Sequence, residues 1–492
     1  MKNFAKLLVM ALVVTLFASL FVFSASAAAK TPAGFDPNTL KPSSDAVIFI
    51  KDAERDPVTG AMTGTIEGDG TGKTPDNPLR PTEHPNYDAT ASSPKKYLQT
   101  AFYQATEELK ETGGTIVFVG PVTLGINESY GSSATNRDVL TAEFGKSNKV
   151  IKFTSVYNGV DYRQTADAKL IIEKPAHVGV LGSSIWDDIT VVTEEERMFW
   201  FDEYATLIGP GFQCVPNDEN QEGVAAHYLS LNMGHRYQKR SNENPTLVVK
   251  GGTFNRIWGA NWGITANYPV KNSTVNITLE GTTRVLGMIT GSCSSTKLDF
   301  GGNVTITING GTYTECDIFG VGPTGLTNAD GRVTIKINDG IFKDLFSIAE
   351  VQPEHTNNAP AVSVLDLSGF KGEKIQMAYI LDVMETFKEV KLPAGVTEQE
   401  LADLLAAVPP ETDAPVTDAP VTDAPATDAP ATDAPATQKP ATQKPATTPA
   451  PTDNGEEGGE FPTAIVIIAA VAVVAIAAVV VVIVLKKKKA AK

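Results

Sequence analysis

Apolar and polar residues alternate in several short segments of the chain, and a glycine follows each segment at a nearly constant interval. Four segments start at Val275, Val304, Val333 and Val362, each 29 residues after the last, and Leu247-Val-Val249 precedes them in the same phase. Alternation with a period of two is typical of a strand with one buried face. A fixed repeat of strand and glycine turn is typical of a solenoid. The pattern predicts an all-β fold, a right-handed parallel β-helix in which the four valines lie one above another.

Aromatic residues follow the glycines in nearly the same phase, at Phe254, Tyr313, Phe342 and Phe370. Stacked repeats would place these rings above one another inside the fold. In the repeat that starts at 275, Arg284 falls at this position instead. A shift of one residue would put Arg284 in a solvated turn, and we favour this because a buried unpaired guanidinium costs several kcal/mol. An antiparallel β-sandwich with a chance spacing is the alternative fold.

The two ends of the chain predict its location. Residues 1–29 have the basic start, apolar core and small-residue end of a secretory signal. Residues 464–485 are 22 uncharged, mostly apolar residues, long enough for one transmembrane helix. Four lysines open the tail 486–492, which predicts a cytoplasmic C-terminus and argues against a glycolipid anchor. We expect a single-pass cell-membrane protein with an extracellular globular part.

Residues 409–460 predict a stalk, because a Thr-Asp-Ala-Pro motif places a proline at every fifth position. Such a segment favours extended polyproline II structure and holds the globular part away from the membrane. The chain has only three cysteines, Cys214, Cys293 and Cys316, too few for a disulfide framework. Together with the stalk and anchor, this suggests the surface of a Gram-positive-type bacterium.

Charge narrows the choice of partners. Without the signal and the tail, 34 basic residues face 57 acidic ones, a net charge of −23. Such a surface repels nucleic acid. It would bind a polyuronate only through a cation or a local basic patch.

The predicted β-helix, residues 113–395, has expected caps at both ends. A turn-rich region, 30–96, comes first, and its Gly68–Gly72 cluster is read as a solvated turn, with a calcium loop as the alternative. Residues 97–112 predict an amphipathic capping helix before a first strand at 115–119. Residues 396–408 carry a capping box and predict a short C-terminal helix. We expect no cofactor apart from this calcium alternative, and no other metal site.

The start of the globular part combines three features: Gly-Asp-Gly-Thr at 68–71, a helix with Leu98, Gln99 and Ala101, and Gly113-Gly114-Thr-Ile-Val-Phe. In these features it resembles the pectate lyase-like superfamily of β-helix proteins. The resemblance extends through the repeats over most of 68–370 and implies the β-helix fold and polysaccharide substrates. The insertion 73–96 departs from the usual compact form.

The catalytic motifs of that superfamily are largely missing. The polygalacturonase branch uses Asn-Thr-Asp, Asp-Asp, His-Gly and Arg-Ile-Lys segments, and only Asp187-Asp188 echoes them. Hydrolysis needs two carboxylates at a defined separation, and the sequence selects no such pair. The Arg-x-Pro-x-x-Arg pattern of lyases is also missing. We read Asp187-Asp188 as a solvated turn.

The candidate binding site is a break in the repeat, where an over-long loop is expected at 213–245. This loop collects histidines and a basic cluster in an otherwise acidic part of the chain. Exposed tryptophans in the flanking repeats would stack on sugar rings. If Trp258 is fully buried, or if replacing Trp258 and Arg236 unfolds the repeat, these are core residues, and the column Asn255, Thr314 and Lys343 is the alternative site. The predicted ligand-binding residues are His235, Arg236, Trp258, Trp262, Asp202 and Glu203.

Three functions fit these observations. The first is a non-catalytic surface protein that displays a glycan- or host-binding face. The second is a surface-tethered polysaccharide lyase or glycoside hydrolase. The third is a structural spacer of the cell envelope. Fold alone does not decide between them. The missing catalytic motifs favour the first, with extracellular polysaccharide or a host surface as the partner.

Overall fold

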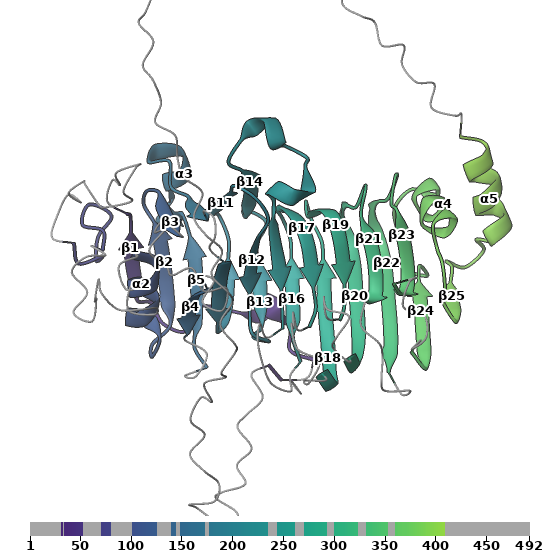
Figure 1. The fold of residues 1–492 in the computed structure, drawn as a ribbon, viewed down its shortest axis with the longest axis horizontal. Helices are drawn as coiled ribbons and strands as arrows, with labels where there is room; N and C mark the ends of the chain where they lie inside the picture. Colours follow the sequence, from purple (N-terminus) through teal and green to yellow (C-terminus); the bar gives the residue numbers. More distant parts are fainter. Residues whose placement is uncertain are drawn as a thin grey trace, which may run out of the picture. The chain divides into compact units, whose positions relative to one another are not determined.

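The computed structural model describes residues 31–32, 34–52, 70–79, 101–124, 139–143, 148–172, 177–234, 244–260, 270–292, 300–322, 331–352 and 360–408. All of them belong to one compact unit that ends at Thr412. The unit is all-β, with one large parallel sheet and few helices (Figure 1).

The strands form three stacks, named A, B and C here. From β2 to β15 the chain passes from stack A to C to B and then returns to A one level further on, and from β16 to β24 it alternates between stacks A and B. Consecutive levels pair in parallel. Stack A comprises β1 (Val47–Ile50), β2 (Gly114–Phe118), β5 (Val150–Thr154), β10 (Ser183–Trp186), β13 (Thr206–Ile208), β16 (Thr246–Val249), β18 (Val270–Leu279), β20 (Phe300–Thr312), β22 (Arg332–Ile341), β24 (Val362–Asp366) and β25 (Glu389–Lys391). Stack B comprises β4 (Val139–Glu143), β9 (His177–Leu181), β12 (Arg197–Trp200), β15 (Leu229–Asn232), β17 (Thr253–Trp258), β19 (Arg284–Thr290), β21 (Asp317–Val321) and β23 (Ser347–Val351). Stack C comprises β3 (Val122–Leu124), β8 (Leu170–Ile172), β11 (Thr190–Thr193) and β14 (Gln213–Pro216), and a separate hairpin joins β6 (Val156–Tyr157) to β7 (Val160–Asp161).

The repeated segments pair as their alternation predicts. Val275 lies opposite Val304, and Val304 opposite Val333, in parallel register. All three are buried, while the intervening residues of β18, β20 and β22 are half-exposed. Parallel pairing of these strands is therefore confirmed. The expectation for Val362 is wrong, because Ser363 lies opposite Val333 and Val362 opposite Arg332.

Aromatic rings stack inside the fold. The centroids of Phe212 and Phe254 are 5.7 Å apart with 14° between the ring planes, and those of Tyr313 and Phe342 are 5.4 Å apart with 15°. Val285 takes the intervening level opposite Phe254, and Arg284 lies one residue before it, opposite Thr312. The predicted one-residue shift at Arg284 is confirmed, but the solvated turn is not: Arg284 is the half-buried first residue of β19, and its Nε is buried without a partner.

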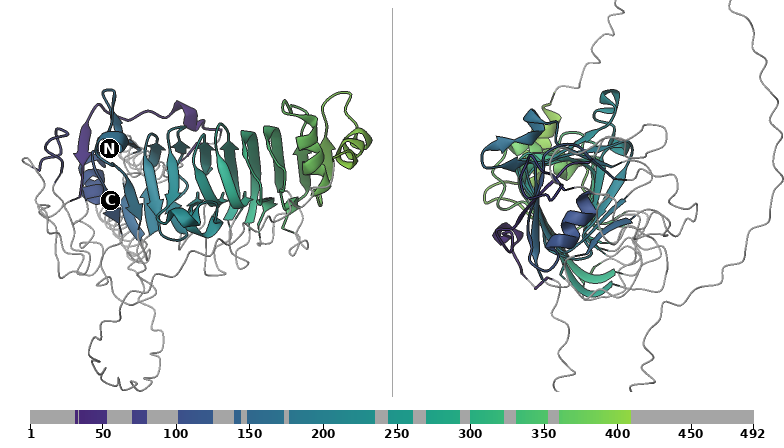
Figure 2. Two further views of the ribbon diagram at one scale, coloured as in Figure 1. Left: turned by 90° about the horizontal axis from the view of Figure 1, so that it is seen from above. Right: turned by 90° about the vertical axis from the view of Figure 1, so that its left-hand side faces the viewer.

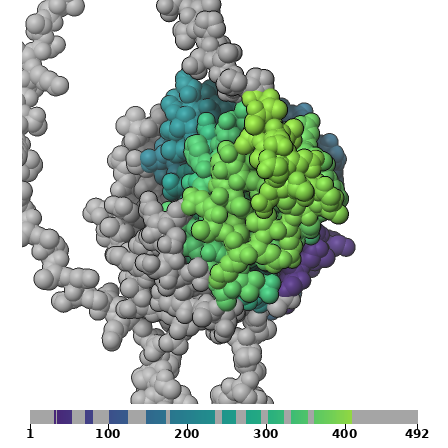
Figure 3. All heavy atoms as spheres, turned by 90° about the vertical axis from the view of Figure 1, so that its right-hand side faces the viewer, coloured from purple at the N-terminus to yellow at the C-terminus, as the bar shows by residue number. Residues whose placement is uncertain are grey.

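Helices cover both ends of the stacks. At the N-terminal end, α2 (Ala101–Leu109) buries Phe102 and Leu109, within the range expected for a capping helix. At the C-terminal end lie α4 (Lys374–Asp382) and α5 (Glu398–Ala406), which cover that end in Figure 3. Thr397 caps α5 by accepting a hydrogen bond from the Glu400 amide at 3.1 Å, as the capping box predicts. These helices shield strand edges that would otherwise remain unpaired.

An N-terminal strap, residues 31–32 and 34–46, lies along stack A (Figure 2, purple). The short helix η1 (Pro37–Thr39) contacts β13 and β16, and Ser43 exchanges hydrogen bonds with Val150. The strap leads into β1, which pairs with β2. No strand is expected from the sequence before residue 115, so β1 is a correction.

Two more strands correct the over-long loop expected at 213–245. The chain forms β14 there and then, after the short helices η5 (Glu219–Gln221) and η6 (Ala225–His227), it forms β15. This region therefore contributes two strands to one level of the stacks, and the segment with η5 and η6 is an insertion between them. The helix α3 (Tyr162–Thr165) is a similar small insertion between β7 and β8.

No helix in the described ranges is long and apolar enough to cross a membrane. The expected signal 1–29, stalk 409–460, transmembrane span 464–485 and tail 486–492 lie outside the described residues.

Candidate functional site on the outer face of stack B

One row of stack B is buried on its outer face. Register pairs link Trp200 to Asn232, Asn232 to Trp258, Trp258 to Thr290, and Thr290 to Phe319. Each is at most 4 % exposed, whereas the outward residues of stack A, such as Thr305 and Lys336, are half-exposed. We call Trp200, Asn232 and Trp258 the outer row. A row of large side chains buried outside the core is unusual for a sheet that has one solvated face.

Strand alternation places these side chains. Phe199, Leu231 and Ile257 belong to the main core, so their neighbours Trp200, Asn232 and Trp258 point to the opposite face. Met198, two residues before Trp200, shares this face, and Met198, Trp200 and Trp258 form an apolar cluster separate from the main core.

Two hydrogen-bond donors in the outer row have no partner. The Asn232 side-chain oxygen accepts a hydrogen bond from the Gly234 amide at 2.9 Å, which fixes the orientation of the side-chain amide. Its Nδ2 group and the indole Nε1 of Trp258 are buried without an acceptor. Leaving a buried donor unpaired costs about 1–3 kcal/mol. Asn232 and Trp258 are register partners, so the two donors lie on adjacent strands of one face.

Arg256 borders the row. Its guanidinium lies 5.9 Å from the centre of the Trp258 ring and 3.7 Å from Glu196. Ser230 donates a 2.7 Å hydrogen bond to the other oxygen of Glu196. Arg256 is therefore held by an acid and a ring, and its side chain remains 42 % exposed.

The corner after β12 is conformationally strained. Asp202 and Glu203 are both buried and both adopt positive φ, at 46° and 71°. Side chains other than glycine rarely adopt this backbone, and such strain is concentrated at functional sites. The Glu203 amide donates to the Met233 carbonyl at 2.6 Å, and Thr31 of the strap donates to the Glu203 carbonyl at 2.8 Å.

The fold brings together part of the predicted site. Asp202 and Glu203 lie on the same edge as Trp258, with the level of Met233 between them, since Met233 pairs with both Glu203 and Trp258. His235 and Arg236 follow Gly234 directly, and Trp262 follows Ala260 by two residues, but all three lie outside the described residues. Trp258 is only 4 % exposed, so the expectation of a partly exposed indole is wrong. In the alternative column, Asn255 is buried and Thr314 and Lys343 are half-buried.

Sequence reasoning missed Asn232 and Met198. The segment Leu229-Ser-Leu-Asn232 does alternate, and that signal places Asn232 outward. It is only four residues long and was absorbed into the expected loop.

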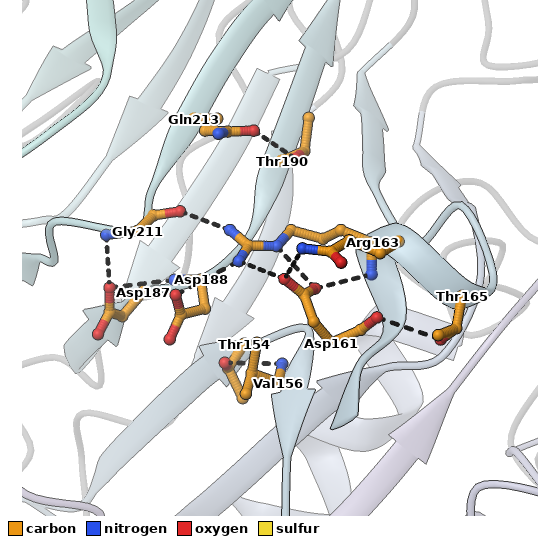
Figure 4. A network of polar contacts seen from close by, with 11 residues as sticks. Thr154, Val156, Asp161, Arg163, Thr165, Asp187, Asp188, Thr190, Gly211 and Gln213 are labelled. Carbon is orange, nitrogen blue, oxygen red and sulfur yellow. Dashed lines mark hydrogen bonds and ion pairs between the residues drawn. The ribbon is translucent and has the colours of Figure 1, made fainter. Parts of the chain in front are cut away.

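A second polar cluster surrounds Arg163 (Figure 4). Its Nε and Nη2 donate to the two oxygens of Asp161 at 2.9 and 2.8 Å, and its Nη1 donates to the Gly211 carbonyl at 2.8 Å. Nη2 also lies 3.5 Å from Asp188. Asp187 accepts from the amides of Asp188 and Gly211, both at 3.0 Å. The cluster therefore joins α3 to the corners after β10 and β13.

The pKa values of the two acids that contact Arg163 are shifted in opposite directions. Hydrogen bonds from Arg163 lower the pKa of Asp161. Burial, with the nearby Asp187 charge, raises the pKa of Asp188. A Cβ added at Gly211 would lie 2.1 Å from the Asp188 carboxylate, so a side chain there would force Asp188 to move. Asp187-Asp188 is thus a half-buried, hydrogen-bonded turn rather than the solvated turn expected from the sequence.

No family model matches the chain, and no curated protein or solved structure matches it at a significant level. Among the described residues, no group of three or more His, Cys, Asp or Glu side chains is arranged to hold a metal ion. The resemblance to the pectate lyase-like superfamily remains a prediction.

Proposed function

We propose that the chain is a membrane-anchored cell-surface protein whose right-handed parallel β-helix presents a glycan-binding face at the outer row of stack B, without catalysis. The observation that carries this proposal is the outer row itself. It combines two indoles, a fixed amide and two unpaired donors on one face. A few directed polar groups among aromatic side chains are the usual composition of a saccharide site.

Further features support the same edge. The strained Asp202–Glu203 corner lies beside Met233 and Gly234, and the chain continues from there into His235 and Arg236. The expected signal, stalk and span would present this edge outside the cell. A calcium loop at Gly68–Gly72 has no part in the proposal.

A glycan panel tests the function. The full chain, purified in a detergent without a sugar headgroup, is incubated with soluble oligosaccharides and insoluble polysaccharides. Binding and products are both measured. We expect binding to at least one saccharide with no new reducing ends and no unsaturated product. Turnover would favour the enzyme, and no binding to any glycan would favour a structural spacer.

The Arg163 cluster is the observation that favours the alternative, a surface-tethered polysaccharide lyase or glycoside hydrolase. A carboxyl with a raised pKa beside a second carboxylate, as at Asp188 and Asp187, is a feature of acid–base catalysis. However, Arg163 is already engaged by Asp161, Gly211 and Asp188, which is the arrangement of a structural clamp. We therefore rank the enzyme second.

A further inference from the structure

The outer row offers donors and apolar surface to a ligand but no free acceptor of its own among the groups described here. The Asn232 side-chain oxygen is used by the Gly234 amide, which leaves only its Nδ2 donor. The Trp258 indole can only donate, and its Nε1 has no acceptor. Met198 and Trp200 supply apolar contact on the same face. The complementary group is therefore one with an acceptor oxygen and an apolar part.

We propose that the outer row binds the acetamido group of an N-acetylated amino sugar, an inference that rests on the proposed glycan-binding function. The acetamido carbonyl accepts hydrogen bonds from Asn232 Nδ2 and Trp258 Nε1. Its methyl group packs against the cluster of Met198 and Trp200. A sugar hydroxyl fits less well, because it brings a donor that needs an acceptor and has no methyl group.

Charge selects the same neutral group over a carboxylate. Glu196 lies beside the row, and the cation on its border, Arg256, is engaged by Glu196 and by the Trp258 ring. An anionic sugar would meet this acid without a free cation among the described residues of the row. An acetamido group carries no charge and avoids this cost.

Burial of the donors affects the kinetics. Asn232 is 0 % exposed and Trp258 is 4 % exposed, so the protein has to open before the sugar reaches them. We expect association below the typical range of about 10⁵–10⁷ M⁻¹s⁻¹, because binding then requires a conformational change.

The test compares three β-1,4-linked hexamers that differ only at C2: those of N-acetylglucosamine, glucosamine and glucose. Affinity for the full chain in sugar-free detergent is measured by calorimetry. We expect the N-acetylglucosamine hexamer to bind at least tenfold more tightly than the other two. Trp258→Phe keeps an aromatic ring and removes the indole donor, and it should weaken binding about tenfold, the effect of one lost hydrogen bond.

Asn232→Leu should weaken binding similarly, and Asn309→Leu is its matched control. Asn309 lies on stack A and accepts from Asn338 at 2.7 Å, away from the row, so its loss should leave affinity unchanged. If Asn232→Leu unfolds because Gly234 loses its acceptor, Trp258→Phe alone decides.

The outcomes separate the two proposals. Equal binding of the glucose hexamer would overturn the acetamido assignment and leave a glycan-binding protein. Unchanged affinity in Trp258→Phe would overturn the assignment to the outer row. No binding of any hexamer, together with silence on the glycan panel, would overturn both.

Discussion

At the scale of single residues, a column of glycines sets how closely the stacks approach. Gly259, Gly291 and Gly320 directly follow Trp258, Thr290 and Phe319 at successive levels of stack B. A Cβ added at each would lie 2.0–2.4 Å from the Cγ1 of Val275, Val304 or Val333, respectively. No side chain fits at that distance. The conformational freedom of glycine is not the reason, since these three residues lack positive φ.

We therefore expect Gly291→Ala to lower the free energy of unfolding by about 1–3 kcal/mol, the usual cost of overpacking. Val304→Ala removes the clashing methyl groups, so the double variant should be more stable than the sum of the single changes predicts. Denaturant unfolding of the four proteins measures this coupling. If the two changes in unfolding free energy simply added, this would contradict a contact between a side chain at position 291 and Val304.

Periodicity predicts which way a residue points but not whether its outward face is covered. Alternation with Leu231 and Ile257 places Asn232 and Trp258 outward. Their burial depends on what packs over that face, and this is a tertiary property that strand spacing does not encode. For this reason the exposed-indole expectation at Trp258 failed, although its position on the edge was anticipated.

At the scale of elements, the repeated strands were predictable because they are long and alternate strictly. The register of β18, β20 and β22 follows directly from the 29-residue spacing. The shorter strands were not predictable from the sequence, because Val47–Ile50 is a continuous apolar run and Gln213–Pro216 ends in proline. Such segments form strands because neighbouring levels supply hydrogen-bond partners. Tertiary pairing therefore overrides weak local signals.

The Arg163 clamp also acts between elements. Its guanidinium meets Asp161 in a two-point contact, and the side chains are only 19 % and 22 % exposed. Two-point pairs of this kind are stronger than single contacts. No sequence spacing indicated the clamp, because Asp161, Asp188 and Gly211 come together only when three levels stack.

Arg163→Met should therefore lower the free energy of unfolding by about 1–3 kcal/mol near pH 7. Arg163 lowers the pKa of Asp161, so this contribution is present above the ordinary aspartate pKa of about 3.9 and is lost as pH falls through the lowered value. The contribution of Asp188 to stability depends on pH in the opposite way. Its raised pKa favours folding at low pH, and this contribution is lost as pH rises through the raised value. Without Arg163, which lowers the pKa of Asp188, this loss is larger.

The difference between wild type and Arg163→Met should consequently shrink below about pH 4. Unfolding measured at pH 7, 5 and 3 tests this. Lys169→Met is the control, because its 2.7 Å pair is with Asp167, whose side chain is 73 % exposed, and a surface pair should contribute little. A difference that stays constant with pH would argue against the clamp.

At the scale of the whole molecule, the strap links the N-terminal end of the described chain to the candidate edge. Thr31 is buried, donates to the Glu203 carbonyl and accepts from Asn244 at 3.1 Å. The strap then runs back to β1 at the other end of stack A. One chain segment thus spans several levels and braces the strained corner beside the outer row.

The most direct test of the outer row uses the indole N–H signals of the full chain, which contains four tryptophans. Trp186 donates to Ser184 in the core, at 3.1 Å, and serves as the internal reference, whereas Trp258 has no acceptor. With ¹⁵N-labelled tryptophan and a saturating amount of the best-binding oligosaccharide, the account predicts that the Trp258 signal shifts and the Trp186 signal stays. Binding that leaves the Trp258 signal unmoved would contradict it.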